Sequence, residues 1–214
     1  MKKTLLLLVA MATSWSVAAQ TYCTPAYSSG CSFGDYLDDV TVGTFTDLST
    51  GCSTGAFDDA TSDTITMTIG VPTNITLTSG YSTQYYAVWI DLNSDGDFED
   101  ANEFIWSSPS ASGSSGTATT GSLLVSTSAT AGSYRMRIMD QYGGSQIGAS
   151  ESCTGGSYGE THDYTVKLES PPACLDPVNV VANMGQFDAT LSWDGDTNVS
   201  YFLIEYDTSG FSLG

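Results

Sequence analysis

One stretch of the sequence combines the residue types and the spacing of a cation site. The segment DLNSDGDFEDANE begins at Asp91, directly after the apolar run YYAVWI, and its first ten residues include five acids. Charges this dense repel one another unless a counter-charge or an open loop accommodates them. Asp91, Asn93 and Asp95 stand at alternate positions, and Gly96 and Asp97 follow. This order matches the start of an EF-hand calcium loop, with side-chain oxygens at positions 1, 3 and 5, a glycine at 6 and a carbonyl at 7.

The end of the segment departs from the EF-hand pattern. Position 12 of an EF-hand loop is an acid that binds with both oxygens. Here Asn102 occupies that position, and Glu103 comes one residue later. No helix signal precedes or follows the loop, so the expected structure is a calcium-bound β-hairpin and not an EF-hand. The alternative is a solvated acidic turn that holds no metal.

Other residue combinations give little support for catalysis. His162 precedes Asp163 and serines are abundant, but no nucleophile elbow or similar motif accompanies them. We expect His162 to be a strand residue near the surface. A single histidine and the lack of a C-x-x-C pair argue against catalytic zinc, and carboxylate pairs arise by chance in so acidic a chain. The sequence therefore predicts no catalytic residues.

Two arginines alternate in the segment SYRMRIMD, which places Arg135 and Arg137 on the same face of a strand. Basic residues are rare in this chain, so each arginine is expected to pair with a carboxylate. Glu160 and Asp163, at the start of the last strand of this region, are the candidates. Exposed arginines on an edge strand are the alternative.

The N-terminus has the features of an export signal. Two lysines precede an apolar run, and small residues ending at Ala19 offer a cleavage site, so residues 1–19 are predicted to be a signal peptide. The remaining chain has three basic residues against 24 acids, a formal charge of −21. This charge argues against binding nucleic acid or anionic lipid and favours cations as partners. The apolar run is too short and interrupted to span a membrane.

All five cysteines follow the predicted signal peptide, and disulfides are the default for an exported protein. Four of them allow three pairings. We favour Cys31–Cys52, which closes the N-terminal hairpin region, and Cys23–Cys153, which ties the first strand to the turn before the last one. Cys174 is left unpaired, and its expected partner lies beyond the end of this sequence.

The strand pattern predicts an all-β fold of the antiparallel Ig-like or jelly-roll type. In DTITMTI, alternate residues are apolar, as in a strand with one buried face. QYYAVWID is more uniformly apolar, as in a central strand buried on both faces. Further short strands follow, separated by glycine, serine and asparagine turns, as in a β-sandwich spanning residues 20–168.

The composition changes at ESPPACLDP, whose prolines predict a linker over residues 169–177. Beyond it, ATLSW and SYFLIEY are two strand-like segments on either side of a DGD turn. Residues 178–214 are too few to close a two-sheet core. We therefore expect this part to be the beginning of an incomplete second sandwich, in a fragment of a larger protein.

Four motifs in order resemble the GEVED domain of secreted Bacteroidota proteins: YCTPAYSSGCSFGDYLDDVTV, VWIDLNSDGDFEDANE, AGSYRMRI and GETHDYTVKL. In the last motif, Thr161 and His162 replace the usual Val and second Glu. The family pattern also places an acid at Glu103, which makes Glu103 the expected closing calcium ligand. Residues 175–214 resemble the first strands of a fibronectin type III domain. Related proteins carry such modules in tandem, often before a sorting domain for type IX secretion.

These observations favour a non-catalytic exported module that serves as a spacer, an adhesive part or a substrate-targeting part of a larger secreted or cell-surface protein. Two alternatives stay open. Tyrosine and tryptophan are plentiful enough for a carbohydrate-binding module, although aromatic residues such as Trp89 and Tyr164 are expected to fill the core. The chain could also precede a catalytic hydrolase domain, either a protease or a glycosidase. The partners expected are calcium, an extracellular glycan or protein, and the missing C-terminal domains.

Overall fold

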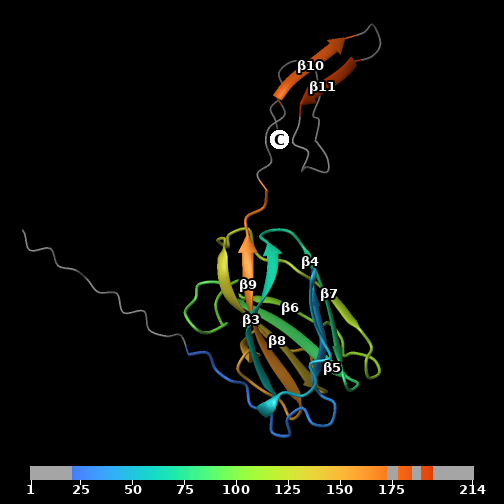
Figure 1. The fold of residues 1–214 in the computed structure, drawn as a ribbon, viewed down its shortest axis with the longest axis vertical. Coiled ribbons are helices and arrows are strands. Elements are labelled where there is room, and N and C mark those ends of the chain that lie inside the picture. The colour runs from blue at the N-terminus through green and yellow to red at the C-terminus, as the bar shows by residue number, and fades with distance from the viewer. Residues whose placement is uncertain (1–20, 173–177, 185–188, 195–214) are drawn as a thin grey trace, which may run out of the picture. The chain divides into compact units, whose positions relative to one another are not determined.

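The computed structural model describes residues 21–172, 178–184 and 189–194 (Figure 1). The predicted signal peptide, Cys174 and the segment SYFLIEY lie outside these residues. The described elements are β1 (Leu37–Val42), β2 (Phe45–Leu48), the 3-10 turn η1 (Thr54–Ala56), β3 (Phe57–Thr68), β4 (Thr73–Ser79), β5 (Gln84–Asp91), β6 (Phe104–Ser107), β7 (Thr119–Leu123), β8 (Gly132–Tyr142), the 3-10 turn η2 (Ala149–Glu151), β9 (Gly159–Glu169), β10 (Val178–Met184) and β11 (Ala189–Asp194).

The chain divides between Glu169 and Ser170 into two compact units. Strands β1 to β9 belong to the first unit, and β9 continues to Glu169, the first residue of the predicted linker. In the second unit, β10 and β11 form an antiparallel pair, which contains Trp193 in β11. No helix in the described part of the chain is long and apolar enough to cross a membrane.

The first unit is a sandwich of two sheets, which confirms the predicted all-β class (Figure 1). One sheet has the order β2-β1-β4-β7 and the other has the order β3-β9-β8-β5-β6. Neighbouring strands are antiparallel, apart from β3 and β9, which run parallel. A parallel pair needs a long crossover connection, and the chain from β4 to β8 supplies it.

The main core lies between the two sheets and follows the alternation of the strands. Ile65 and Met67 of β3 point inward as the period-two pattern predicts, and both are buried. They meet apolar side chains of the facing sheet, including Ile75 and Leu77 of β4. Burial of each such side chain contributes about 1.5–3 kcal/mol. The sandwich is therefore held together by ordinary two-sheet packing.

Strand β5 is buried on both of its faces, as its sequence predicts. Tyr86, Val88 and Ile90 point into the main core. Its other face contributes to a second, smaller core that is covered by loops and comprises Ala87, Trp89, Phe98, Met139 and Ile147. The indole nitrogen of Trp89 donates to the carbonyl of Ala149 at 2.9 Å. The loops on this outer face are therefore part of the folded structure, and one of them is the acidic loop.

Candidate functional site

The acidic loop, residues 91–103, is organised around the carboxylate of Asp91. This side chain is fully buried at the end of β5. Its Oδ1 accepts hydrogen bonds from the backbone N–H groups of Ser94 at 2.6 Å and Asp95 at 3.3 Å, and its Oδ2 accepts from Gly96 at 3.1 Å. Ser94 and Gly96 adopt positive φ, which glycine tolerates without strain. Asp91 therefore fixes the turn from inside.

Glu103 closes the other end of the loop in the same way. It is 1% exposed. Its Oε1 accepts from the backbone N–H of Leu92 at 2.8 Å and of Asn93 at 3.4 Å, and its Oε2 accepts from Asp100 at 3.2 Å. Burial raises the pKa of the Glu103 carboxyl, although these hydrogen bonds oppose the shift. The first and last acids of the predicted ligand set thus hold the backbone of the loop.

The exposed face of the loop gathers three other carboxylates. One oxygen each from Asp95, Asp97 and Asp100 lies within 4.8 Å of the others. The amide nitrogen of Asn93 donates to Asp95 Oδ2 at 2.9 Å and to Asp100 Oδ2. The Asn93 amide is the main reason that the pKa of Asp95 is lowered, with a bond from the Asp97 N–H adding to the effect. The amide therefore partly compensates the crowded negative charge.

This geometry suits a calcium ion in some respects. It separates the predicted ligands into two groups, one that binds the backbone inside the loop and one on the exposed face. Ca²⁺–oxygen distances are about 2.3–2.6 Å, so ligands on opposite sides of the ion lie up to about 5 Å apart. The three exposed carboxylates meet that requirement. Asp100 was not among the predicted ligands, because it has no place in the EF-hand spacing, although it belongs to the same acidic run. Asn93 presents its amide nitrogen to these carboxylates, whereas a ligand would have to present oxygen.

A buried guanidinium lies behind the loop and packs against its one inward-facing aromatic ring. Phe98, at 1% exposure, turns inward from the acidic loop and covers Arg137, whose guanidinium carbon is 4.8 Å from the ring centroid. Tyr22 packs against Phe98 with ring centroids 5.4 Å apart, and its hydroxyl donates to Asp91 Oδ2 at 2.6 Å. The acidic loop is thus anchored to the N-terminal segment and to the arginine beneath it.

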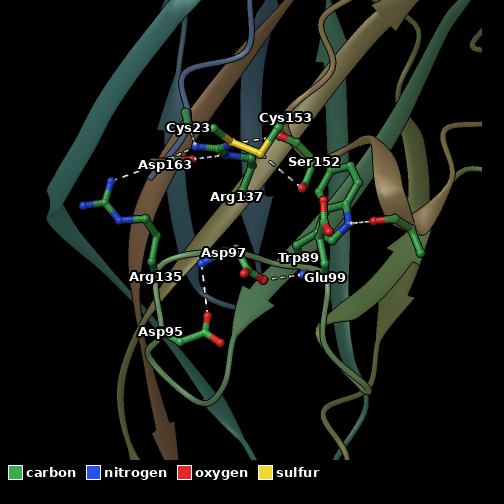
Figure 2. Close-up of a disulfide and its surroundings, with 11 residues drawn as sticks. Cys23, Trp89, Asp95, Asp97, Glu99, Arg135, Arg137, Ser152, Cys153 and Asp163 are labelled. Carbon is green, nitrogen blue, oxygen red and sulfur yellow. Dashed lines mark hydrogen bonds and ion pairs between the residues drawn. A yellow bond between two sulfur atoms is a disulfide. The ribbon is translucent and has the colours of Figure 1, made fainter. Parts of the chain in front are cut away.

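Arg137 is fully buried, and its side chain contacts polar groups from several separate parts of the chain (Figure 2). It forms a two-pronged pair with Asp163, through Nε at 2.7 Å and Nη2 at 2.9 Å. It also donates to the carbonyl oxygens of Ser152 and Cys23, each at 2.8 Å. The arginine therefore joins β8, β9, the η2 turn and the N-terminal segment at one point.

Arg135 uses the same carboxylate from a more exposed position. Its Nη1 lies 3.1 Å from Asp163 and 3.6 Å from Asp59, and its guanidinium stacks on Tyr22 at 4.3 Å. The prediction that both arginines pair with carboxylates is confirmed for Asp163. It is wrong for Glu160, because residues 160 and 163 differ by an odd number and point to opposite faces of β9.

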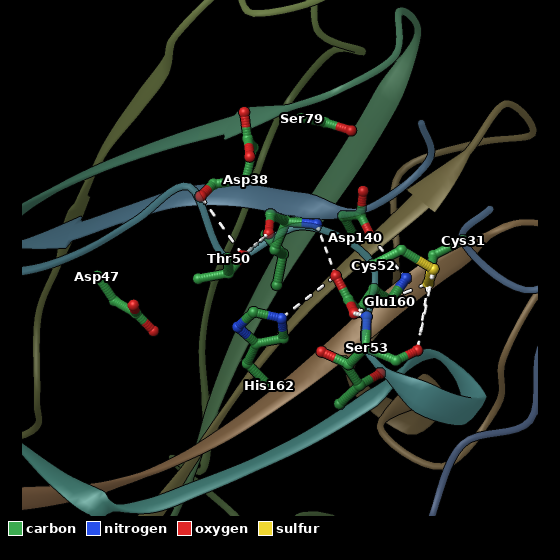
Figure 3. Close-up of polar contacts among 12 residues, drawn as sticks. Cys31, Asp38, Asp47, Thr50, Cys52, Ser53, Ser79, Asp140, Glu160 and His162 are labelled. Atoms are coloured by element: carbon green, nitrogen blue, oxygen red, sulfur yellow. Dashed lines mark hydrogen bonds and ion pairs between the residues drawn. A yellow bond between two sulfur atoms is a disulfide. The ribbon is translucent and has the colours of Figure 1, made fainter. Parts of the chain in front are cut away.

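Both predicted disulfides are present. Cys23–Cys153 joins residues 130 positions apart beside Arg137, and Cys31–Cys52 closes a loop of 21 (Figures 2 and 3). We expected the Cys23–Cys153 bridge to tie the first strand to the turn before the last strand. Cys23 instead lies in an extended segment that is not part of a strand. This bridge fastens an otherwise unpaired N-terminal segment over the outer core.

Glu160, His162 and Tyr164 alternate along the inner face of β9 and are all fully buried. Glu160 accepts from the backbone N–H of Ser53 at 2.6 Å and of Leu37 at 3.1 Å, and its Oε2 lies 3.3 Å from His162 Nε2 (Figure 3). The Nδ1 of His162 lies 3.0 Å from the Tyr164 hydroxyl. The expectation of a histidine near the surface is therefore wrong, since the chain turns this strand face into the core.

Asp140 is the most perturbed acid of the described residues. It is fully buried, and its Oδ1 accepts from the backbone N–H of Glu160 at 2.6 Å, while its Oδ2 has no hydrogen-bond partner within the described part of the chain. Burial raises the pKa of Asp140 well above its ordinary value, and the nearby charge of Glu160 adds to this, although the bond from the Glu160 N–H opposes it. The buried Tyr86 hydroxyl and Gln84 Oε1 likewise have no partner among the described residues.

Residues 85–167 match the family model of the GEVED domain. The match runs from β5 into β9 and includes the acidic loop and the arginines of β8. The resemblance inferred from the sequence motifs is confirmed for this segment. No curated protein matches the chain.

Proposed function

We propose that this chain is a non-catalytic, exported β-sandwich module whose acidic loop holds a structural calcium ion. The observation that carries the proposal is that the acids of the loop have two different structural roles. Asp91 and Glu103 hold the backbone from inside, and Asp95, Asp97 and Asp100 bring carboxylate oxygens together on the outside. A hairpin that needed only a solvated turn has no reason to converge three like charges.

Calcium would supply the charge that the loop lacks on its exposed side. The ion would bind carboxylate oxygens of Asp95, Asp97 and Asp100, with the Asp97 carbonyl and water completing six to eight ligands. The Asn93 side chain would turn its oxygen toward the ion in place of its amide nitrogen. Of the other two ligands proposed from the sequence, Glu103 accepts three N–H groups and has a lone-pair site left for the ion. Asp91 accepts three N–H groups and the Tyr22 hydroxyl, so it would have to give up one of these bonds to bind the ion. The ion would thereby fix the connection between β5 and β6.

The module's wider role is proposed from its construction. Two disulfides are typical of an oxidising compartment, and they support export to the cell surface or the medium. The hairpin of β10 and β11 is consistent with the start of a fibronectin type III-like second module. Sandwiches in tandem make suitable spacers or adhesive arms. We therefore propose a spacer, adhesive or targeting role within a larger secreted or cell-surface protein.

A thermal melt followed by circular dichroism tests the calcium site. A ligand that binds only the folded state stabilises it by about 2.7 kcal/mol at a hundredfold excess over Kd. The wild type should melt at a higher temperature in calcium than in chelator, and Asp95→Ala should lose most of that difference. Glu99→Ala is the matched control, because it removes the same charge from the same loop outside the carboxylate cluster. Identical wild-type melting temperatures in both buffers would show that the loop is a solvated turn.

A further inference from the structure

A pocket lined mainly by aromatic side chains lies at the other end of β5 from the acidic loop. Its volume is about 290 Å³, and its lining residues are Phe33, Asp35, Tyr81, Tyr142 and Tyr158. These residues come from the segment before β1, the β4–β5 turn, the end of β8 and the residue before β9. Strand β5 begins at Gln84 and ends at Asp91, so the pocket and the acidic loop are separated by roughly 23 Å of strand.

The backbone holds the walls of this aromatic pocket in place. Gly34 and Gly80 approach so closely that a Cβ on Gly34 would lie 3.0 Å from the Gly80 carbonyl oxygen, which brings the segment before β1 against the β4–β5 turn. On the other side, the Tyr142 N–H donates to the Tyr158 carbonyl at 3.1 Å. The Cys31–Cys52 bridge secures the segment that carries Phe33. The aromatic pocket is thus built by fixed backbone contacts.

The four rings form a chain of edge-to-face contacts. Centroid distances are 5.9 Å for Phe33–Tyr158, 6.1 Å for Tyr142–Tyr158 and 5.6 Å for Tyr81–Tyr142, with interplanar angles of 83°, 88° and 66°. Phe33 is 71% exposed, Tyr81 44% and Tyr142 40%. Successive rings are therefore steeply inclined to each other. They do not form the flat aromatic surface on which a sugar ring stacks.

Asp35 places a negative charge in this aromatic pocket. It is 3% exposed, and its Oδ1 accepts a hydrogen bond from Gln84 Nε2 at 2.8 Å. No lysine, arginine or histidine of the described residues forms an ion pair with it. Behind it, Gln84 Oε1 is buried with no hydrogen-bond partner among the described residues. The charge of Asp35 also contributes to the raised pKa of Asp140. The inner end of the pocket is therefore rich in oxygen and poor in positive charge.

We propose that this aromatic pocket binds a small organic cation that carries a quaternary ammonium group. Ring faces attract a cation through their quadrupoles, most strongly where water is excluded. Asp35 supplies the formal counter-charge, and the chain's net charge of −19 attracts cations from a distance. A neutral ligand would be attracted neither by the Asp35 carboxylate nor by the net negative charge of the chain.

The test uses choline as the probe and its neutral isostere 3,3-dimethylbutan-1-ol as the matched ligand, at constant ionic strength. Binding to the full chain is followed by tyrosine fluorescence and by aromatic proton shifts. Choline should bind saturably and the isostere should bind much more weakly. Asp35→Asn keeps an oxygen that can accept from Gln84 but removes the charge, so choline affinity should fall by roughly tenfold or more.

Phe33→Ala should weaken choline binding about two- to fivefold, as for one exposed cation–π contact. Leu124→Ala removes another exposed apolar side chain, at 54% exposure, outside the aromatic pocket and should change nothing. Thermal melts establish that each variant folds. Equal affinity for choline and its isostere, full affinity in Asp35→Asn, binding of methyl glucoside in place of choline, or no saturable choline binding would each overturn the proposal. The measurements are repeated in calcium and in chelator, so that failure of the calcium site is recognised separately.

Discussion

Arg137 should be the most sensitive polar residue of the first unit. Replacing it by methionine keeps the length of the side chain but leaves the Asp163 carboxylate fully buried without its two-pronged partner. Removing one member of a buried ion pair costs about 3–5 kcal/mol. The carbonyl oxygens of Ser152 and Cys23 lose their donor as well. For a unit of this size, the expected fall in melting temperature is about 6–20 °C.

Arg135→Met is the matched control for this variant. It removes the same charge from the same strand and the same carboxylate partner, but the Arg135 side chain is 24% exposed. Exposed pairs contribute about 0–1 kcal/mol, so Arg135→Met should be nearly neutral. Adding Asp163→Leu to Arg137→Met should restore part of the stability, because no unpaired buried charge remains.

The assay is urea unfolding under oxidising conditions, with the disulfides verified on a non-reducing gel. This check is needed because Arg137 contacts the Cys23 residue of one bridge. The reasoning predicts a clear order, with Arg137→Met the least stable, the double variant intermediate and Arg135→Met closest to the wild type. Equal losses in the two arginine variants would refute it, because burial would then not be what makes Arg137 important.

Three further predictions concern the acidic loop, the disulfides and the buried acid. Asn93→Asp should widen the gap between the melting temperatures in calcium and in chelator, because it adds an oxygen ligand and, without the ion, a further negative charge beside Asp95; an unchanged gap would count against calcium in the loop. Replacing both cysteines of the Cys23–Cys153 bridge by serine should cost about 5 kcal/mol of unfolding free energy, against about 3 for Cys31–Cys52, because the closed loops span 130 and 21 residues. Urea midpoints measure both losses, and a larger loss for the shorter loop would contradict the entropic account. Because the folded-state pKa of Asp140 is raised, its contribution to stability is fully present below the unfolded pKa and is lost as pH rises through the folded value. Asp140→Asn should therefore gain stability relative to the wild type as pH increases. If the difference in melting temperature between the variant and the wild type stays the same at every pH, Asp140 is not held neutral.

Some features of this protein follow from local sequence alone. The alternation in β3 and the continuous apolar run of β5 predict burial on one face and on both faces, because side chains alternate along any strand. The same parity rule places Glu160 and Asp163 on opposite faces of a strand, so the sequence allowed the arginines to pair with only one of them; the register of β8 against β9 decided that it is Asp163. The acidic loop can also be recognised from the sequence, since the spacing typical of cation ligands lies within one short segment.

Other features depend on contacts that no local pattern specifies. The parallel pairing of β3 with β9 and the burial of His162 require knowing which strand face meets the second sheet. Within the acidic loop, only the folded turn shows that Asp91 and Glu103 bind backbone while Asp100 joins the exposed carboxylates. The aromatic pocket brings together residues from four separate segments of the chain. The sequence determined the strands and the charges, because these depend on neighbours along the chain; the tertiary structure decided which of them meet, because that depends on strand register and sheet order.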